Sequence, residues 1–357
     1  MVSKEQKPVN KPTDEPALDV KKSAEAVLAA IEKEREREIV SRRFGLFDRK
    51  ETLEQIGELL GITRERVRQL EKAAVTRLKA QAEQGKLTSL VEVENTFVEL
   101  LTNSGNAARI ATISAQLTEE NSRIDQSRVA FLSKLCPKLI SLDENVEFYA
   151  GAALYSAYDD KKLKAQVKTV VEAVKAINEP VAIEKIAEQA KIEDPKTAES
   201  LASLSKKLAT LNGRWGLIKW PMVNPKNIRD KIYVILYENK KHMHFSEIAE
   251  AIKESDFKRK NVTMQAIHNE LIKDKRFVLV GRGIYALKEW GYKKGTVADV
   301  ITDVLEKAGE PLHRDEIVKR VLKDRYVKET TILLNLQGKP QFKRVAKATY
   351  TLAEEKS

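Results

Sequence analysis

The stretch GITRERVRQLEKAA, from Gly61 to Ala74, gathers side chains that could bind an anion. Three arginines, a glutamate and a glutamine occupy residues 64–69. Guanidinium forks and side-chain amides are groups that hydrogen-bond to base edges in the major groove of DNA. The stretch therefore predicts a helix that reads an anionic partner. The alternative is an ordinary solvated helix surface with ion pairs between neighbouring turns.

The flanking residues predict how this stretch is held. Thr52 and Gln55 fit a capping box at the start of a short helix. Gly61 fits the left-handed position that ends that helix, and Thr63 can cap the next one. In the second helix the residues at apolar spacing, which should face inward, are Val67, Leu70, Ala74 and Leu78. The polar residues left outside are Arg64, Glu65, Arg68, Gln69 and Lys72. This layout predicts a helix-turn-helix.

The distribution of charge supports an anionic partner. The 357-residue chain has a formal net charge of +11. Residues 35–82 hold 12 basic and 8 acidic side chains, and residues 226–294 hold 16 and 9. Residues 83–164 hold 9 basic and 12 acidic side chains, which favours packing or protein contact there over contact with phosphate.

The segments EREREIVSRRFGL and TLEQIGELLGITRERVRQLEKAAVTRLK, within residues 34–80, closely resemble region four of bacterial primary (sigma-seventy class) sigma factors. That module recognises the promoter −35 element. The resemblance implies base contacts by Arg64, Glu65, Arg68 and Gln69. Arg66 and Arg68 could each contact either bases or phosphates. The resemblance also implies phosphate contacts by Arg35, Arg43, Leu53, Thr63, Arg66 and Lys72. For Leu53 the contact would be made by the backbone, because a helix N-terminus attracts anions.

The segment before this match departs from the family. A sigma factor also uses upstream aromatic side chains to trap the bases of the melted −10 element. The 33 residues before Glu34 contain no aromatic residue. We therefore expect this chain to read a promoter-like element without opening the promoter.

The rest of the sequence repeats one pattern. EPVAIEKIAEQA at residue 179, KHMHFSEIAEAI at 241 and EPLHRDEIVKRV at 310 each follow an apolar helical segment. Each is followed by a further helical segment and then by strand-like residues. This order of elements predicts winged-helix units, and a fainter copy with a turn at residues 143–145 would be a fourth.

The expected fold class is therefore mainly α, with a sigma-region-four-like helix-turn-helix and three or four tandem winged-helix units, each carrying a small β-hairpin wing. The expected divisions are a disordered tail (1–22), the helix-turn-helix (23–84), a divergent winged helix (85–164) and winged helices at 165–225, 226–294 and 295–357.

Residues 226–294 resemble the HARE-HTH family and the N-terminal domain of the RNA polymerase delta subunit, chiefly through DKRFVLVGRGIYALKEWGY. The resemblance implies either DNA binding or action on RNA polymerase. In the preceding helix Met264, Ile267 and Leu271 should face inward. The residues that could contact DNA are Lys258, Arg259, Lys260, Gln265, His268, Asn269 and Arg282. The alternative is a basic solvated surface. Trp215, Tyr285 and Trp290 are expected in the core.

No constellation predicts catalysis, a cofactor or a metal. His242 and His244 have a spacing that could chelate a metal, but no second pair at zinc-site spacing accompanies them. The single cysteine, Cys136, and the lack of an apolar span or signal peptide favour the cytoplasm, in association with the nucleoid.

The function expected from the sequence is a sequence-specific, DNA-binding transcriptional regulator whose partner is double-stranded DNA. The helix starting at Arg64 would enter the major groove, assisted by winged-helix modules. One alternative is a delta-like accessory protein bound to RNA polymerase core. The other is a nucleoid-structuring protein that bridges DNA. The target sequence, the direction of regulation and the oligomeric state stay open.

Overall fold

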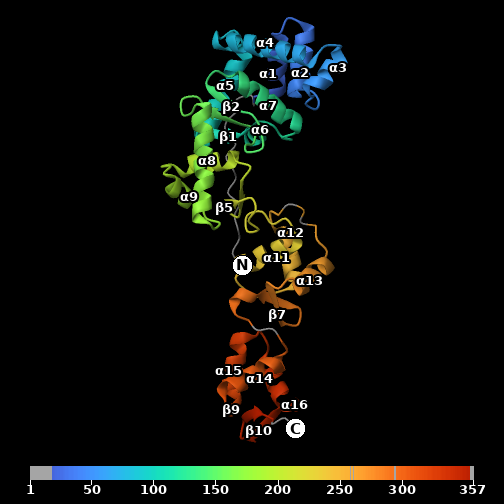
Figure 1. Ribbon diagram of the computed structural model, residues 1–357, viewed down its shortest axis with the longest axis vertical. Coiled ribbons are helices and arrows are strands. Elements are labelled where there is room, and N and C mark those ends of the chain that lie inside the picture. The colour runs from blue at the N-terminus through green and yellow to red at the C-terminus, as the bar shows by residue number, and fades with distance from the viewer. Residues whose placement is uncertain (1–17, 258, 260, 293–294, 354–357) are drawn as a thin grey trace. The chain divides into compact units, whose positions relative to one another are not determined.

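The computed structural model describes residues 18–257, 259, 261–292 and 295–353 (Figure 1). The chain divides into two compact units between Ile218 and Lys219. The described residues form sixteen α-helices and small antiparallel sheets, which confirms the expected fold class. Each unit is described by itself below.

The first module of unit 1 consists of four helices: α1 (Val20–Ala29), α2 (Glu34–Phe44), α3 (Leu53–Leu60) and α4 (Arg64–Glu83). Val27, Leu28, Ile31, Ile39 and Val40 recur at helical spacing, which predicts one helix capped by Ser23 and ended at Phe44. This prediction is wrong, because α1 and α2 are separate helices. The carboxylate of Asp19, rather than Ser23, caps α1, and the Arg37 guanidinium donates to the carbonyl of Ile31 at the break before α2. α1 also begins inside the expected tail, whose residues 1–17 lie outside the described part of the chain.

The second module of unit 1 has the order helix, strand, helix, helix, strand, strand. Its elements are α5 (Thr88–Asn103), β1 (Ala107–Arg109), α6 (Ile110–Leu117), α7 (Arg123–Leu135), β2 (Leu139–Leu142) and β3 (Gly151–Leu154). The strands form an antiparallel sheet in the order β1-β3-β2. This is the winged-helix arrangement, with β2 and β3 as the wing.

The third module of unit 1 repeats this order with a reduced first strand. Its elements are α8 (Asp160–Ile177), α9 (Ile183–Ala190), α10 (Pro195–Leu204), β4 (Leu208–Leu211) and β5 (Arg214–Leu217). In place of the first strand, Val181 forms a single bridge to Trp215. Because α8 already begins at Asp160, the boundary expected between residues 164 and 165 falls inside a helix.

Unit 2 contains a fourth and a fifth module with the same topology. The fourth consists of α11 (Ile228–Asn239), β6 (Met243–His244), α12 (Phe245–Glu254), α13 (Met264–Lys273), β7 (Phe277–Gly281) and β8 (Ile284–Leu287). The fifth consists of α14 (Val297–Ala308), β9 (Leu312–His313), α15 (Arg314–Asp324), α16 (Glu329–Gly338), β10 (Phe342–Ala346) and β11 (Thr349–Leu352). The strand orders, β6-β8-β7 and β10-β11-β9, correspond.

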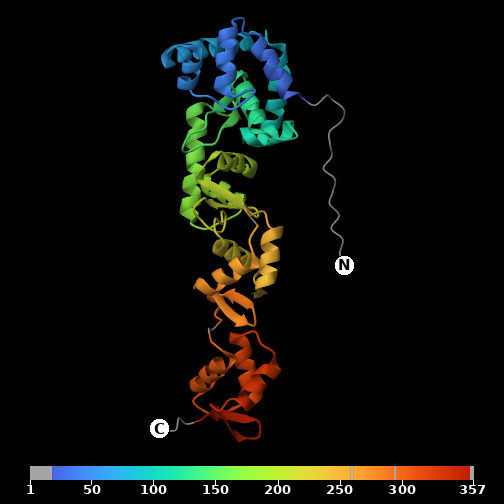
Figure 2. The ribbon, with the colours of Figure 1, turned by 90° about the vertical axis from the view of Figure 1, so that its right-hand side faces the viewer.

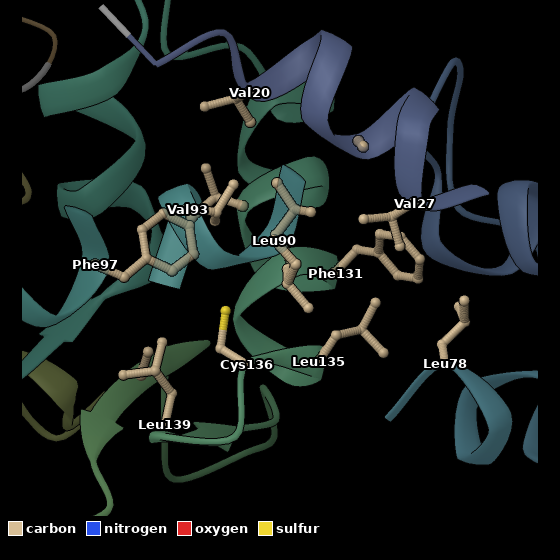
Figure 3. Packing of buried hydrophobic residues seen from close by; sticks show 14 of the residues in the cluster. Val20, Val27, Leu78, Leu90, Val93, Phe97, Phe131, Leu135, Cys136 and Leu139 are labelled. Atoms are coloured by element: carbon tan, nitrogen blue, oxygen red, sulfur yellow. The ribbon is translucent and has the colours of Figure 1, made fainter. Parts of the chain in front are cut away.

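One continuous core joins the first and second modules (Figure 3). Val27 of α1 and Leu78 of α4 belong to the same cluster as Phe97, Phe131 and Leu135 of the second module. A hydrogen bond of 2.9 Å from Arg128 Nε to the carbonyl of Leu46 also links the two modules. The expected boundary between residues 84 and 85 therefore does not separate two cores.

The third helices of the second and third modules are used for packing inside unit 1. α7 lies against α1, α2 and α4, and residues on several of its sides are buried. α10 lies against β1, where Ser200 Oγ donates to the carbonyl of Gly105 at 3.2 Å. The amide of Tyr149 donates to the carbonyl of Leu204 at the end of α10, at 2.9 Å. Because α7 and α10 are packed against neighbouring elements, neither presents an open helix surface to a nucleic acid.

Candidate nucleic-acid interface

The turn between α3 and α4 is set by local sequence. Thr52 and Gln55 form the expected capping box, and Thr63 Oγ1 accepts from the amide of Arg66 at 3.2 Å. Gly61 has a φ of +63°, as the helix-ending position requires. Gly57 lets α3 approach the turn, since a Cβ there would lie 2.7 Å from the carbonyl oxygen of Ile62.

A small core fixes the direction of α4. Ile39 of α2, Ile56 of α3 and Val67 of α4 are fully buried together, with Leu70 half-buried at the edge of this cluster. The inward positions expected for α4 are confirmed. The residues expected outside are indeed exposed: Arg64, Glu65, Arg68, Gln69 and Lys72. We call these five residues the α4 edge.

Two residues of the α4 edge, Glu65 and Arg68, form an ion pair with each other. Arg68 donates through Nε and Nη2 to the two carboxylate oxygens of Glu65, at 2.8 and 2.6 Å. The hydrogen bond from Arg68 holds the pKa of Glu65 below its ordinary value, and the carboxylate raises the pKa of Arg68. Because both side chains are more than half exposed, the pair can open at little cost. A base contact by Arg68 would exchange the carboxylate for a base edge.

The other members of the edge are bound less tightly. Arg66 Nη1 donates to Gln69 Oε1 at 3.4 Å, a long contact that orients the amide. Within the described part of the chain, Arg64 and Lys72 form no ion pair. The edge therefore presents cations and an amide whose groups can rearrange onto a partner.

Two residues expected to bind phosphate hold the helices together in this structure. Arg35 Nη2 donates to the carbonyl of Leu60 at the end of α3, at 2.6 Å. Arg43 is half-buried; its Nη1 donates to the carbonyl of Glu51 at 3.2 Å and its Nε lies 3.5 Å from Glu71. The phosphate contacts stay a prediction, and these two side chains also have a structural role. Leu53 is half-buried at the start of α3, and Thr63 and Arg66 are exposed.

Sequence reasoning missed an ion pair between a buried carboxylate and an exposed arginine on the opposite side of α4. The Glu36 side chain is 5% exposed, and its carboxylate accepts a hydrogen bond from the Arg77 guanidinium. Lys33 Nζ lies 3.6 Å from Glu36 Oε1. Arg77 is one of the 12 basic side chains of residues 35–82 that favour an anionic partner. Glu36 stands three and four positions before the buried Ile39 and Val40, so the helical period places it on the inner face of α2. The period does not predict its partner, because Arg77 lies 41 positions away.

The fourth module bears out its expected residues only partly. Of the basic run before α13, Lys258 and Lys260 lie outside the described residues, and Arg259 is exposed with a φ of 55°. Met264 was expected inside but is 54% exposed, because Thr263 caps α13 and puts Met264 in its first turn. Ile267 and Leu271 are buried as expected.

The remaining predicted residues of that module fall into two groups. Gln265 and Asn269 are exposed and bonded to each other at 3.0 Å, and Arg282 is exposed at the wing tip. His268 was expected outside, but it is half-buried, with its ring 5.2 Å from Phe245. Trp215 and Tyr285 are buried as expected, and Trp290 is half-buried against the sheet.

His242 and His244, whose spacing could chelate a metal, have other partners in the structure. The His242 ring lies against that of Tyr326, with ring centroids 3.9 Å apart and planes tilted by 35°. His244 caps α12, with Nδ1 accepting from the amide of Ser246. Across the described residues, no three histidine, cysteine or acidic side chains lie close enough to hold a metal. No helix in the same part of the chain is long and apolar enough to span a bilayer.

Known proteins resemble one segment of the chain. Residues 33–80 match the family described as sigma-70, region 4. The RNA polymerase sigma factor RpoD of Helicobacter pylori is 45% identical over 64 residues, which are 17% of this chain and 9% of that protein. SigA of a Bacillus species is 39% identical over 83 residues, 23% of this chain and 22% of that protein. Arabidopsis thaliana sigB is 50% identical over 46 residues, 13% of this chain and 8% of that protein.

The chain therefore spans less than a quarter of the length of these relatives. The matched segment contains α2, α3 and all but the end of α4, and it omits α1. The expected resemblance of residues 34–80 is confirmed: this part of the chain is similar to region 4 of sigma-70 factors.

Proposed function

We propose that this protein binds double-stranded DNA sequence-specifically and regulates transcription by placing α4 in the major groove. The observation that carries the proposal is the α4 edge, an exposed set of guanidinium, ammonium and amide groups on a helix whose opposite side is buried. Such groups at the start of a second helix can form paired hydrogen bonds with base edges. The similarity to sigma-70 region 4 supports the same reading mode.

The structure supports a single reader in unit 1. α7 and α10 are covered by neighbouring modules, so α4 is the third-helix equivalent that unit 1 presents outward. The shared core with the second module makes this reader part of a larger rigid body. A rigid body loses less conformational entropy when it binds, so its contacts contribute more fully to affinity.

The test is selection of bound duplexes with the full chain, repeated with Gln69→Ala. We expect a defined sequence to be enriched, and Gln69→Ala to cost about 1–3 kcal/mol and relax preference at one or two positions. Thr76→Ala, also exposed on α4 but beyond the edge, is the matched control. An unchanged preference in the Gln69 variant would refute direct readout there.

Phosphate contact needs a separate variant. Lys72→Ala should weaken binding to all sequences alike, because phosphates carry no sequence information directly. Arg43 is a poor choice for this purpose, since its removal would also break the contacts with Glu51 and Glu71. Equal affinity of the Lys72 variant and the parent protein at every salt concentration would argue against this contact.

A second candidate is an RNA polymerase accessory role. Its support is that the relatives of residues 33–80 are RNA polymerase sigma factors and that the fourth module resembles delta-like domains. Phe47 and Leu59, which are 50% and 56% exposed on the first module, offer an apolar contact. Co-purification of core polymerase with the full chain in the absence of DNA tests this role. If the chain mixed with core polymerase sediments separately from it at physiological salt, this role is refuted.

A third role, bridging DNA within the nucleoid of the cytoplasm, predicts a different binding pattern. A bridging protein would coat duplexes evenly and would join two of them. A footprint confined to one site would favour the regulator.

A further inference from the structure

The wing of the fifth module has a charge pattern different from the other wings. Between Glu329 and Glu354 the chain contains no carboxylate, while the hairpin and its turn carry Lys343, Arg344 and Lys347. The second-module wing holds three acids and no base between its strands, and Lys206 and Lys207 bind two of those acids. The third and fourth wings each carry one arginine and no other charge.

This wing also protrudes from its module. In β10 only Phe342 is buried, and the next four residues, Lys343 to Ala346, are all exposed. Side chains of a strand alternate between its two faces, so four exposed residues in a row mean that neither face is covered. By contrast, β7 of the fourth module buries three of its five residues. Figure 2 shows the hairpin (red) beyond the helices of its own module.

The three cations are available to a partner. Within the described residues none of them forms an ion pair. Arg344 Nε donates to the carbonyl of Ala346 at 3.2 Å, which holds the guanidinium near the tip. A register shift between Arg344 and Ala346 and the positive φ of Ala348 twist the tip.

An edge strand can carry charge for another reason. Among the described strands β10 pairs only with β11, and cations on such an edge strand discourage pairing with other chains. That role would account for Lys343 and Arg344. It does not account for Lys347, which lies in the turn, or for the absence of carboxylates over the whole segment.

We propose that the β10–β11 wing is a second nucleic-acid contact, which binds the phosphates of duplex DNA through Lys343, Arg344 and Lys347 without reading sequence. The inference rests on the proposed function for its ligand, but it assigns a separate site in the other unit. Because a linked second contact acts at a high effective concentration, it strengthens the binding of the α4 edge without adding base preference.

The experiment compares the full chain with the triple variant Lys343→Gln, Arg344→Gln, Lys347→Gln. A duplex bearing the selected sequence and a scrambled duplex are titrated from 50 to 200 mM salt. Three phosphate contacts account for a slope of about 2.7 in log affinity against log salt. We expect the slope of log affinity against log salt to be smaller in magnitude by about 2–3 for the triple variant than for the unmodified chain. The variant should also bind both duplexes at least about tenfold more weakly at 50 mM salt.

The matched control removes three exposed lysines from the helices of the same module: Lys307, Lys319 and Lys323. This control has the same net charge as the wing variant, so a general loss of positive field would affect both equally. An equal effect of the two triple variants would overturn the proposal. A normal slope in the wing variant would also overturn it, and loss of polymerase binding alone would assign the wing to a protein partner.

A measurement on the unmodified chain guards against misfolding of the variant. Lysine acetylation followed by mass spectrometry should show Lys343 and Lys347 protected by the scrambled duplex and Lys319 unprotected. Equal reactivity of the wing lysines with and without DNA would refute the proposal. Gln69→Ala separates the two proposals, because it should change base preference and leave wing protection intact.

Discussion

The shared core of the first two modules makes a quantitative prediction at Phe131. This side chain of α7 is fully buried, and its ring centroid lies 5.0 Å from that of Phe44 at the end of α2. Truncation of a buried phenylalanine to alanine costs about 3–5 kcal/mol through lost transfer energy and a residual cavity. Since a domain of this kind is stable by roughly 5–15 kcal/mol, Phe131→Ala should remove a large part of the total.

The consequence for the helix-turn-helix is the decisive part of this prediction. We expect Phe131→Ala to lower the opening free energy of amides in α4 as much as that of amides in α7, because both belong to one cooperative unit. Native-state hydrogen exchange measures this residue by residue. Val146→Ala, at a side chain 93% exposed, is the control and should change stability by less than about 0.5 kcal/mol. Full protection of α4 while α7 loses its own would refute the shared unit.

Three further predictions concern single contacts. Arg77→Leu should destabilise unit 1 by about 1–3 kcal/mol in urea melts, because it removes a partner of the buried Glu36 carboxylate and leaves Lys33 beside it. The double variant Glu36→Leu, Arg77→Leu should recover most of this loss, and no recovery would contradict the pairing. Gly57→Ala should cost about 1–3 kcal/mol, since its Cβ would press on the Ile62 carbonyl; an unchanged melting temperature would show that the turn can shift. The hydrogen bond from Arg276 holds the pKa of Asp274 below its ordinary value, so its stabilising effect is present above about pH 4 and is lost as the pH falls through the depressed value. Melting of the parent protein and Asp274→Asn should therefore converge at low pH; a constant difference down to pH 2 would exclude this linkage.

The parts of the structure that sequence predicted well depend on local interactions. Thr52, Gln55, Gly61 and Thr63 act within a few residues of themselves, so their types and spacing suffice to predict the caps and the turn. The repeated order of helices and strands was also predictable, because each module uses the same spacing of buried residues. The exposure of the α4 edge followed from the helical period alone.

The parts that failed depend on partners distant in sequence. The break between α1 and α2 places Val27 in the large shared core and Ile39 in the smaller one, and a periodic pattern cannot show that two helices serve different cores. The partner of the buried Glu36 carboxylate is Arg77, which is 41 positions away. The continuity of the first two modules depends on Phe44 and Phe131, whose contact no repeat or composition shift signals.

The continuous core has a consequence for synthesis of the chain. Leu78 leaves the ribosome before its partners in α7 exist, and Cys136 follows it by 58 positions. At about 5–20 residues per second, the apolar side of α4 waits for roughly 3–12 s with no second module to cover it. During that interval an apolar surface of the nascent helix-turn-helix, which is buried in the finished protein, is exposed to solvent. A chaperone can bind this surface until the second module covers it. α4 therefore acquires its support from the second module only after the ribosome has moved well beyond it.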